Sequence, residues 1–250
     1  MRVTRLLALI TFLAASACVD AGAPIAVEPT TRSPSPSASP EETRRPSPTP
    51  TRTRTRTPTP TPTRTLPATD TRARLTRDAC GGGDATRTVE FRIAVDGGLR
   101  TTAHEFGSVV RGILCDERSW IGSGAVRFRY DPAGSMLIGL RTPDNAEARC
   151  YALIRLSVNR FYSCGTPQEI VINSDRWFEN SPYWPGPLDE YRTMLTNHEV
   201  GHGLLLHHSE CPRDGAPAPV MMQQSKGMNL NGNRCRPNPW PLPRELALLT

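Results

Sequence analysis

The chain has 250 residues and a formal net charge of +6, with 30 lysine and arginine residues against 24 acidic ones. The excess of positive charge lies upstream of residue 79, because residues 79–250 hold 18 basic and 18 acidic side chains. A neutral C-terminal part lacks the overall positive charge that is typical of nucleic-acid-binding domains, so we expect no nucleic-acid partner.

Residues 1–18 have the pattern of a signal peptide. Two arginines precede an apolar run from Leu6 to Ala17, which is shorter than the roughly 20 residues of a membrane-spanning helix. Ala15 and Ala17 fit the small-residue pattern of a cleavage site, and Cys18 follows as in a bacterial lipobox, whose cysteine is acylated. Lipoboxes usually carry leucine where Ala15 stands, so ordinary cleavage after Ala17 is the alternative. We expect either an outward-facing protein that Cys18 anchors to the cell membrane or a secreted one.

Residues 19–78 are rich in proline, threonine, serine and arginine, which make up 42 of these 60 residues. Such a chain cannot bury enough apolar surface to offset the entropy of ordering. Proline favours an extended chain of about 3.1 Å per residue, which gives a reach of up to roughly 190 Å. We therefore expect a disordered linker, which serves as a stalk or as a passive spacer.

Residues 79–250 are long enough to form one hydrophobic core, so we expect a single domain. They hold six of the seven cysteines, and an even number in an exported chain indicates disulfides. Pairing of sequence neighbours is favoured, because one bridge would then close a hairpin and another would close the loop beyond a cluster of histidines. The alternative is zinc binding, but the chain has no CxxC spacing. The cysteines are Cys80, Cys115, Cys150, Cys164, Cys211 and Cys235.

The pattern of apolar residues predicts a mixed α+β domain. Alternation predicts strands at 88–95 and 126–130, the apolar run at 135–140 predicts a buried strand, and EIVIN at 169–173 predicts another short strand.

Helices are predicted at two places. Thr102 and Glu105 have the spacing of a capping box ahead of a helix to Leu114. Residues 143–161 fit either a helix or a strand. A late helix is predicted from Leu188 onward, with one face that carries Tyr191, Leu195, His198 and His202.

Four of the five histidines lie between Asn197 and Cys211. His198, Glu199 and His202 form the pattern H-E-x-x-H, in which residues four apart share a helical face, so both imidazoles can reach one metal ion. The five-residue pattern also occurs by chance on amphipathic helices. Further signals therefore have to support a metal site.

His208 lies ten residues after His198, the spacing of a third ligand in the extended pattern H-E-x-x-H-x-x-G-x-x-H. Leu205 stands where that pattern has glycine. If the position requires a positive φ, leucine there costs roughly 1–2 kcal/mol, and the bend at Gly203 is the alternative. His207 is the alternative third ligand. Met221 follows Pro219 and is a candidate for a methionine turn beneath the metal.

Four stretches resemble the metzincin-like C-terminal domain family of actinobacterial exported proteins and lipoproteins: HEVGH at 198–202, HHSEC at 207–211, APAPVMMQQSKG at 216–227 and CRPNPWPLP at 235–243. The similarity is close over 170–243 and weaker from about residue 87. The resemblance implies a zincin-like domain with a small mixed sheet and an active-site helix behind a disordered stalk. It further implies that His198, His202 and His208 bind one zinc ion, that Glu199 is the catalytic acid/base, and that Met221 is the turn methionine. Because the family is poorly characterised, it implies no particular substrate.

Three neutral imidazoles leave a fourth zinc position open for water, whose pKa falls from about 15.7 to about 7. Glu199 would accept its proton and pass it to the leaving amine. No tyrosine follows Met221, so Gln223 or a backbone amide is the candidate oxyanion donor. We expect a monomeric zinc metallopeptidase that acts on a protein or peptide. The alternative is a non-catalytic envelope module with a structural or decayed zinc site.

Overall fold

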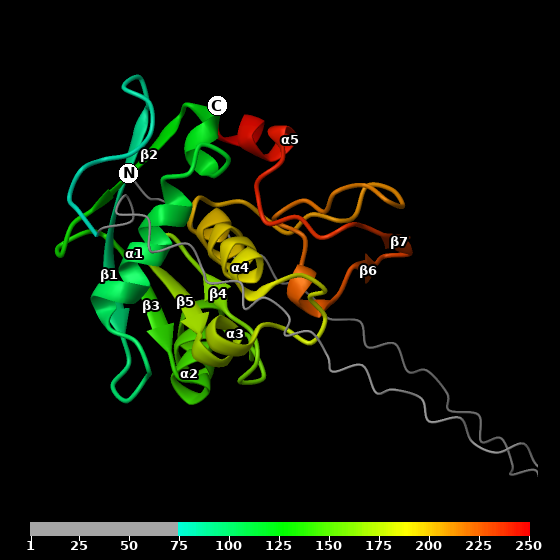
Figure 1. Cartoon of the computed structure of the whole chain (residues 1–250), viewed down its shortest axis with the longest axis horizontal. Coiled ribbons are helices and arrows are strands. Elements are labelled where there is room, and N and C mark those ends of the chain that lie inside the picture. The colour runs from blue at the N-terminus through cyan, green and yellow to red at the C-terminus, as the bar shows by residue number, and fades with distance from the viewer. Residues whose placement is uncertain (1–74) are drawn as a thin grey trace, which may run out of the picture. The chain divides into compact units, whose positions relative to one another are not determined.

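The computed structural model describes residues 75–250 (Figure 1). The expected signal peptide with Cys18 and the expected linker as far as residue 74 lie outside the described residues. Leu75, upstream of the expected domain start at residue 79, packs against the hydrophobic core. The domain therefore begins earlier in the chain than its composition indicates.

A five-stranded mixed sheet forms the centre of the domain, in the order β2-β1-β3-β5-β4. β1 (Arg87–Val95) pairs in parallel with β2 (Val126–Tyr130) and with β3 (Met136–Arg141), and β3 pairs in parallel with β5 (Glu169–Asn173). The two-residue β4 (Cys164–Gly165) is antiparallel to β5 and forms one edge. All residues of β5 are buried, because helices cover both faces of the sheet, and this explains its continuous apolar run.

The four predicted strands are confirmed, each to within one residue. The prediction of a mixed α+β domain is also confirmed. β4 was not predicted, since two residues are too few for a periodic pattern to be recognised. This short strand nevertheless forms the sheet edge beside the histidines.

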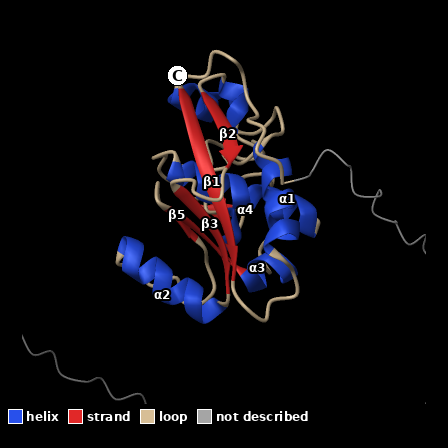
Figure 2. Ribbon diagram, turned by 90° about the vertical axis from the view of Figure 1, so that its left-hand side faces the viewer, coloured by secondary structure: helices blue, strands red, loops and turns tan. Residues whose placement is uncertain are grey.

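Helices lie on both faces of the sheet. Figure 2 shows α2 (Pro143–Ile154) on one face, and α1 (Ala103–Leu114), α3 (Ser174–Glu179) and α4 (Leu188–Gly203) on the other. The capping box predicted for α1 is present, with Glu105 N–H donating to Thr102 Oγ1. The ambiguous segment 143–161 is α2 followed by a loop. α2 begins with Pro143 after a threonine cap, which favours a helix start.

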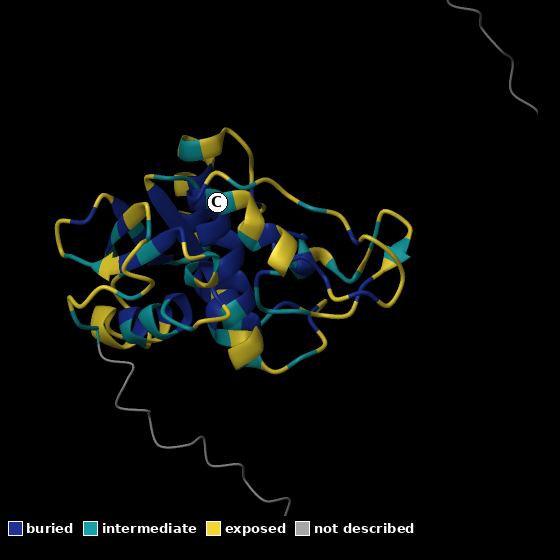
Figure 3. Ribbon diagram, turned by 90° about the horizontal axis from the view of Figure 1, so that it is seen from above, coloured by how far each residue is buried: buried dark blue, intermediate teal, exposed yellow. Residues whose placement is uncertain are grey.

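α4 passes through the interior of the domain, between the sheet and the C-terminal segment, and every residue from Met194 to Gly201 is buried. Figure 3 shows this buried centre among more exposed loops. The C-terminal segment holds a small hairpin of β6 (Asn229–Leu230) and β7 (Asn233–Arg234) and the short helix α5 (Pro243–Leu246). It also holds the 3-10 turns η2 (Gln224–Lys226) and η3 (Ala247–Leu249), whereas the 3-10 turn η1 (Trp120–Ser123) precedes β2. Among residues 75–250, no helix has the length and apolar character needed to cross a bilayer.

Three disulfides join Cys80 to Cys115, Cys150 to Cys164 and Cys211 to Cys235. This is the neighbour pairing that the sequence favoured. One detail of the prediction was wrong, because the bridge between Cys150 and Cys164 does not close a hairpin: it ties α2 to the edge strand β4. The segment 143–161, which the sequence left open between helix and strand, begins with the helix α2, so the bridge joins a helix to a strand.

Candidate metal site

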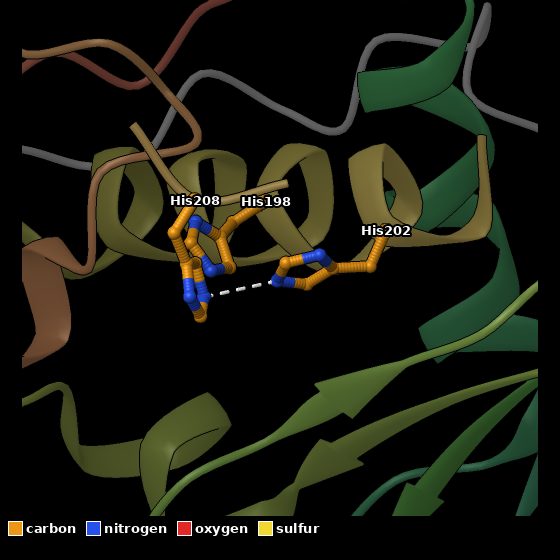
Figure 4. Close-up of side chains that lie close together, drawn as sticks. All are labelled: His198, His202 and His208. Carbon is orange, nitrogen blue, oxygen red and sulfur yellow. Dashed lines mark hydrogen bonds between the residues drawn. The ribbon is translucent and has the colours of Figure 1, made fainter. Parts of the chain in front are cut away.

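Three histidines lie together at the C-terminal end of α4 (Figure 4). His198 and His202 lie one turn apart on the helix, and His208 reaches them from the segment that follows. One ring nitrogen of each lies within 4.8 Å of those of the other two. The ring centroid of His208 is 5.3 Å from that of His198 and 4.7 Å from that of His202. The three side chains are therefore close enough to bind one metal ion.

In His198 and His202, a hydrogen bond determines which ring nitrogen keeps a lone pair for a metal ion. Nδ1 of His198 lies 2.8 Å from Val220 O, and Nδ1 of His202 lies 2.9 Å from Leu206 O. A carbonyl oxygen can only accept, so each Nδ1 carries the hydrogen and each neutral ring keeps its lone pair on Nε2. Such a carbonyl partner is the usual support of a metal-binding histidine.

The surroundings keep these imidazoles neutral. Burial, followed by the neighbouring His202, lowers the pKa of His198 to about 3. Burial and then His202 likewise lower the pKa of His208 to about 4. Because only a neutral imidazole offers a lone pair, both rings are ready to bind a metal ion at neutral pH.

The spacing and the donor type fit zinc. Two nitrogens bound to one tetrahedral zinc at about 2.0–2.1 Å lie about 3.3 Å from each other. His202 Nε2 and His208 Nε2 are 3.1 Å apart, so this pair already has nearly that spacing, and the three ligand nitrogens together lie within 4.8 Å of one another. Imidazole nitrogens suit zinc, copper, iron and nickel better than magnesium or calcium, which prefer oxygen.

The end of α4 brings His208 to the site. Leu205 has a φ of +73°, so the bend lies at Leu205 and not at Gly203. Leu205 N–H donates to His202 O, and Leu206 N–H donates to Gly201 O. These two bonds form a Schellman motif, which normally has glycine at the left-handed position. The same turn places Leu206 O against the ring of His202.

Met221 packs directly beneath α4. A Cβ on Gly201 would clash with Met221 Sδ, so the glycine lets Met221 approach the helix closely. Met222 N–H donates to Pro219 O, which closes a tight turn around Met221. Met221 O accepts from Ser209 N–H, the residue after His208. This turn therefore supports the segment that carries the third histidine.

Glu245 holds this turn in place and was not found by sequence reasoning. Its carboxylate is buried and accepts from the backbone N–H groups of Val220, Met221 and Leu242. Val220 O in turn fixes the ring of His198. Glu245 lies far along the chain in an otherwise ordinary proline-flanked stretch, so no local sequence pattern identifies it.

Glu199 lies beside the histidines in the wall of an open cleft. The cleft has a volume of about 280 Å³, and its lining includes the three histidines, Glu199, Gly165 and residues 223–226. Burial raises the pKa of Glu199 to about 8 in the metal-free protein. A Cβ on Gly165 would lie 2.1 Å from Glu199 O, so β4 runs against the backbone of α4 and forms one side of the cleft.

The remaining site predictions have mixed outcomes. His207 is exposed and lies outside the cluster, so the structure brings His208 and not its neighbour to the site. Gln223, the candidate oxyanion donor, lines the cleft. Cys18 lies outside the described residues.

The chain matches a known protein family. The family described as "Protein of unknown function (DUF3152)" matches residues 65–243, and the chain belongs to this family. No curated protein matches the chain. The matched region begins upstream of Leu75 and ends at Pro243, the first residue of α5, so it includes the three histidines and the turn of Met221 but not Glu245.

Proposed function

We propose that this member of the DUF3152 family is a zinc-dependent peptidase with a zincin-like fold, in which His198, His202 and His208 bind one zinc ion. The observation that carries the proposal is the convergence of three imidazoles beside a buried glutamate in an open cleft. A structural zinc site usually has four protein ligands, whereas this cluster has three within residues 75–250. The resemblance to metzincin-like domains points to the same function.

A zinc ion at this site would activate a water molecule and polarise the carbonyl group of the substrate. Glu199 follows His198 directly and lines the same cleft. Its carboxylate is the one acidic group of the cleft lining, so we assign it the acid/base role. It would accept a proton during attack on the peptide bond and then donate it to the leaving amine.

The shape of the cleft favours an extended peptide as the substrate. β4 pairs with β5 through one edge only, and its other edge offers backbone N–H and C=O groups to a further strand. A peptide that adds to such an edge is held by main-chain hydrogen bonds, whatever its sequence. The apolar side chains of Ile154, Leu156 and Val158 line the same cleft and would pack against peptide side chains.

The three disulfides are typical of a protein that functions outside the cytoplasm. We propose that the mature protein is exported and that Cys18 carries a lipid anchor. The site would then act on proteins or peptides of the cell envelope or its surroundings.

The test compares wild type with Glu199→Gln in zinc content and in cleavage of a mixed peptide library. We expect one zinc per chain in both proteins, and cleavage by wild type alone. Zinc in both proteins without cleavage by either would instead indicate a structural site. A wild-type protein without zinc would contradict the proposal at its first step.

A further inference from the structure

We propose that Lys226 is a specificity-determining residue, which binds a carboxylate of the substrate next to the scissile bond. This inference rests on the proposed peptidase function and adds a substrate class, namely acidic peptides. Lys226 is the only lysine of the chain, and it lines the cleft at the end of the turn η2.

The first observation is that Lys226 lies in the cleft with no acidic partner among residues 75–250. Its ammonium nitrogen lies 5.3 Å from the ring centroid of Tyr162, which lies on the same cleft wall. Lys226 and His208 line the same cleft, so the ammonium and the metal ligands share one space. Lys226 makes no salt bridge with any residue of the described part of the chain. Its charge is therefore available to a ligand.

A second, buried cation lies behind the same wall. The guanidinium of Arg176 lies 4.0 Å from the ring centroid of Phe161, and this ring packs edge-on against Tyr162. Arg176 is 9% exposed, and its Nε and Nη1 have no hydrogen-bond partner among residues 75–250. A buried charge without a counter-ion is costly. Each ring of the aromatic pair therefore has a positive charge beside it: Arg176 lies against Phe161, and Lys226 lies near Tyr162 in the cleft.

The last observation is the net charge of the cleft lining. Apart from the histidines, this lining holds one acid, Glu199, and one base, Lys226. These two charges cancel, and a zinc ion would add two positive charges; a proton that passes from the water to Glu199 stays within the cleft and leaves this sum unchanged. The cleft would therefore be positive during the reaction. A glutamate or aspartate side chain beside the scissile bond supplies the complementary charge.

Kinetics with matched peptides test the proposal. Each pair of peptides differs only in Glu against Gln at one position that flanks the cleaved bond. We expect wild type to prefer the acidic peptide by about fivefold in kcat/KM, the size expected of an exposed ion pair. Lys226→Gln should remove this preference, and Lys226→Glu should reverse it. Arg87→Gln, which removes an exposed charge from the start of β1, is the control and should keep the preference.

A binding measurement separates this proposal from the peptidase function. Zinc-loaded Glu199→Gln protein is titrated with the same peptides, and Glu199→Gln/Lys226→Gln protein is compared with it. Tighter binding of the acidic peptide that depends on Lys226 would support the subsite even if no peptide is cleaved. Equal affinities for both peptides, or equal loss of kcat/KM for both peptides in Lys226→Gln, would overturn it. The latter result would assign Lys226 to the oxyanion instead.

Discussion

At Leu205, the turn that forms the site requires a backbone conformation that leucine disfavours. Its φ of +73° lies in the left-handed region, which costs a residue with a Cβ roughly 1–2 kcal/mol. Its side chain is 65% exposed, so little packing offsets this cost. The strain is retained because the turn places both Leu206 O and His208.

Leu205→Gly should therefore stabilise the protein. We expect a gain of about 1 kcal/mol in the free energy of unfolding, since relief of strain exceeds the entropy that glycine adds to the unfolded chain. Thermal unfolding measures this gain. Leu248→Gly is the control, because Leu248 is 69% exposed and has no positive φ, and it should give no gain. A lower melting temperature for Leu205→Gly would contradict this interpretation.

The third ligand gives the second prediction at the residue scale. His208→Ala removes one of the three converging nitrogens, whereas His207→Ala changes an exposed side chain outside the cluster. We expect His208→Ala to weaken zinc binding by more than the roughly 10- to 100-fold that loss of a ligand's hydrogen-bond partner costs. His207→Ala should change it little. Competition with a chromophoric chelator measures both affinities, and the opposite ranking would show that His207 is the ligand.

At the scale of elements, the site depends on the contact between α4 and the C-terminal segment. Asn197 on α4 accepts from Ser119 Oγ and donates to Pro239 O. Glu245 links α5 to the turn of Met221. The two histidines of α4 are thus oriented by parts of the chain that follow them in sequence.

Glu245→Gln should weaken zinc binding although Glu245 touches no ligand. The amide would turn an N–H group toward a backbone N–H, which loses about 1.5–3 kcal/mol of charged hydrogen bonding and shifts Val220 O away from His198. We expect a 10- to 100-fold lower zinc affinity, measured well below the melting temperature. Glu117→Gln, an exposed site, serves as the control. A less stable protein with unchanged zinc affinity would limit Glu245 to a structural role.

A second link between elements predicts a pH dependence of stability. Asp96, after β1, accepts from Thr142 N–H, Asn145 Nδ2 and Arg141 Nη1 around the start of α2. Burial raises the pKa of Asp96, but the hydrogen bonds of Asn145, Thr142 and Arg141 together hold it below its ordinary value. A carboxyl with a lowered folded-state pKa stabilises the protein above its unfolded-state pKa of about 3.9, and this contribution is lost as the pH falls through the folded-state value.

We therefore expect Asp96→Asn to lower the free energy of unfolding by about 2 kcal/mol at pH 7. The difference from wild type should shrink as the pH falls below about 4. Denaturant unfolding with intact disulfides measures this difference. Asp84→Asn, in an exposed turn, should show no such trend. A difference for Asp96→Asn that grows toward low pH would reverse the sign of the argument.

At the scale of the whole molecule, periodic elements and the metal motif were predictable, whereas their supports were not. The strands and α1 follow from alternation, apolar runs and a capping box, which are local signals. H-E-x-x-H needs only a helix to bring His198 and His202 together. Long-range supports such as Gly165 against Glu199, or Glu245 beneath the turn of Met221, depend on tertiary contacts that no short pattern encodes.

The position of His208 lies between these two cases. Its spacing predicted a ligand, but Leu205 made the turn uncertain, because leucine is uncommon at positive φ. Only the backbone shows that the Schellman motif forms with leucine. The position of Lys226 in the cleft could not be predicted from the sequence either, because a single lysine forms no periodic pattern.

Anomalous X-ray scattering at the zinc edge, from crystals grown with zinc, tests the central claim most directly. We predict one strong peak about 2.0–2.1 Å from Nε2 of His198, His202 and His208, with a fourth position that faces the cleft and has no protein ligand. A peak elsewhere, no peak, or a fourth protein side chain on the ion would contradict the assignment of an open zinc site.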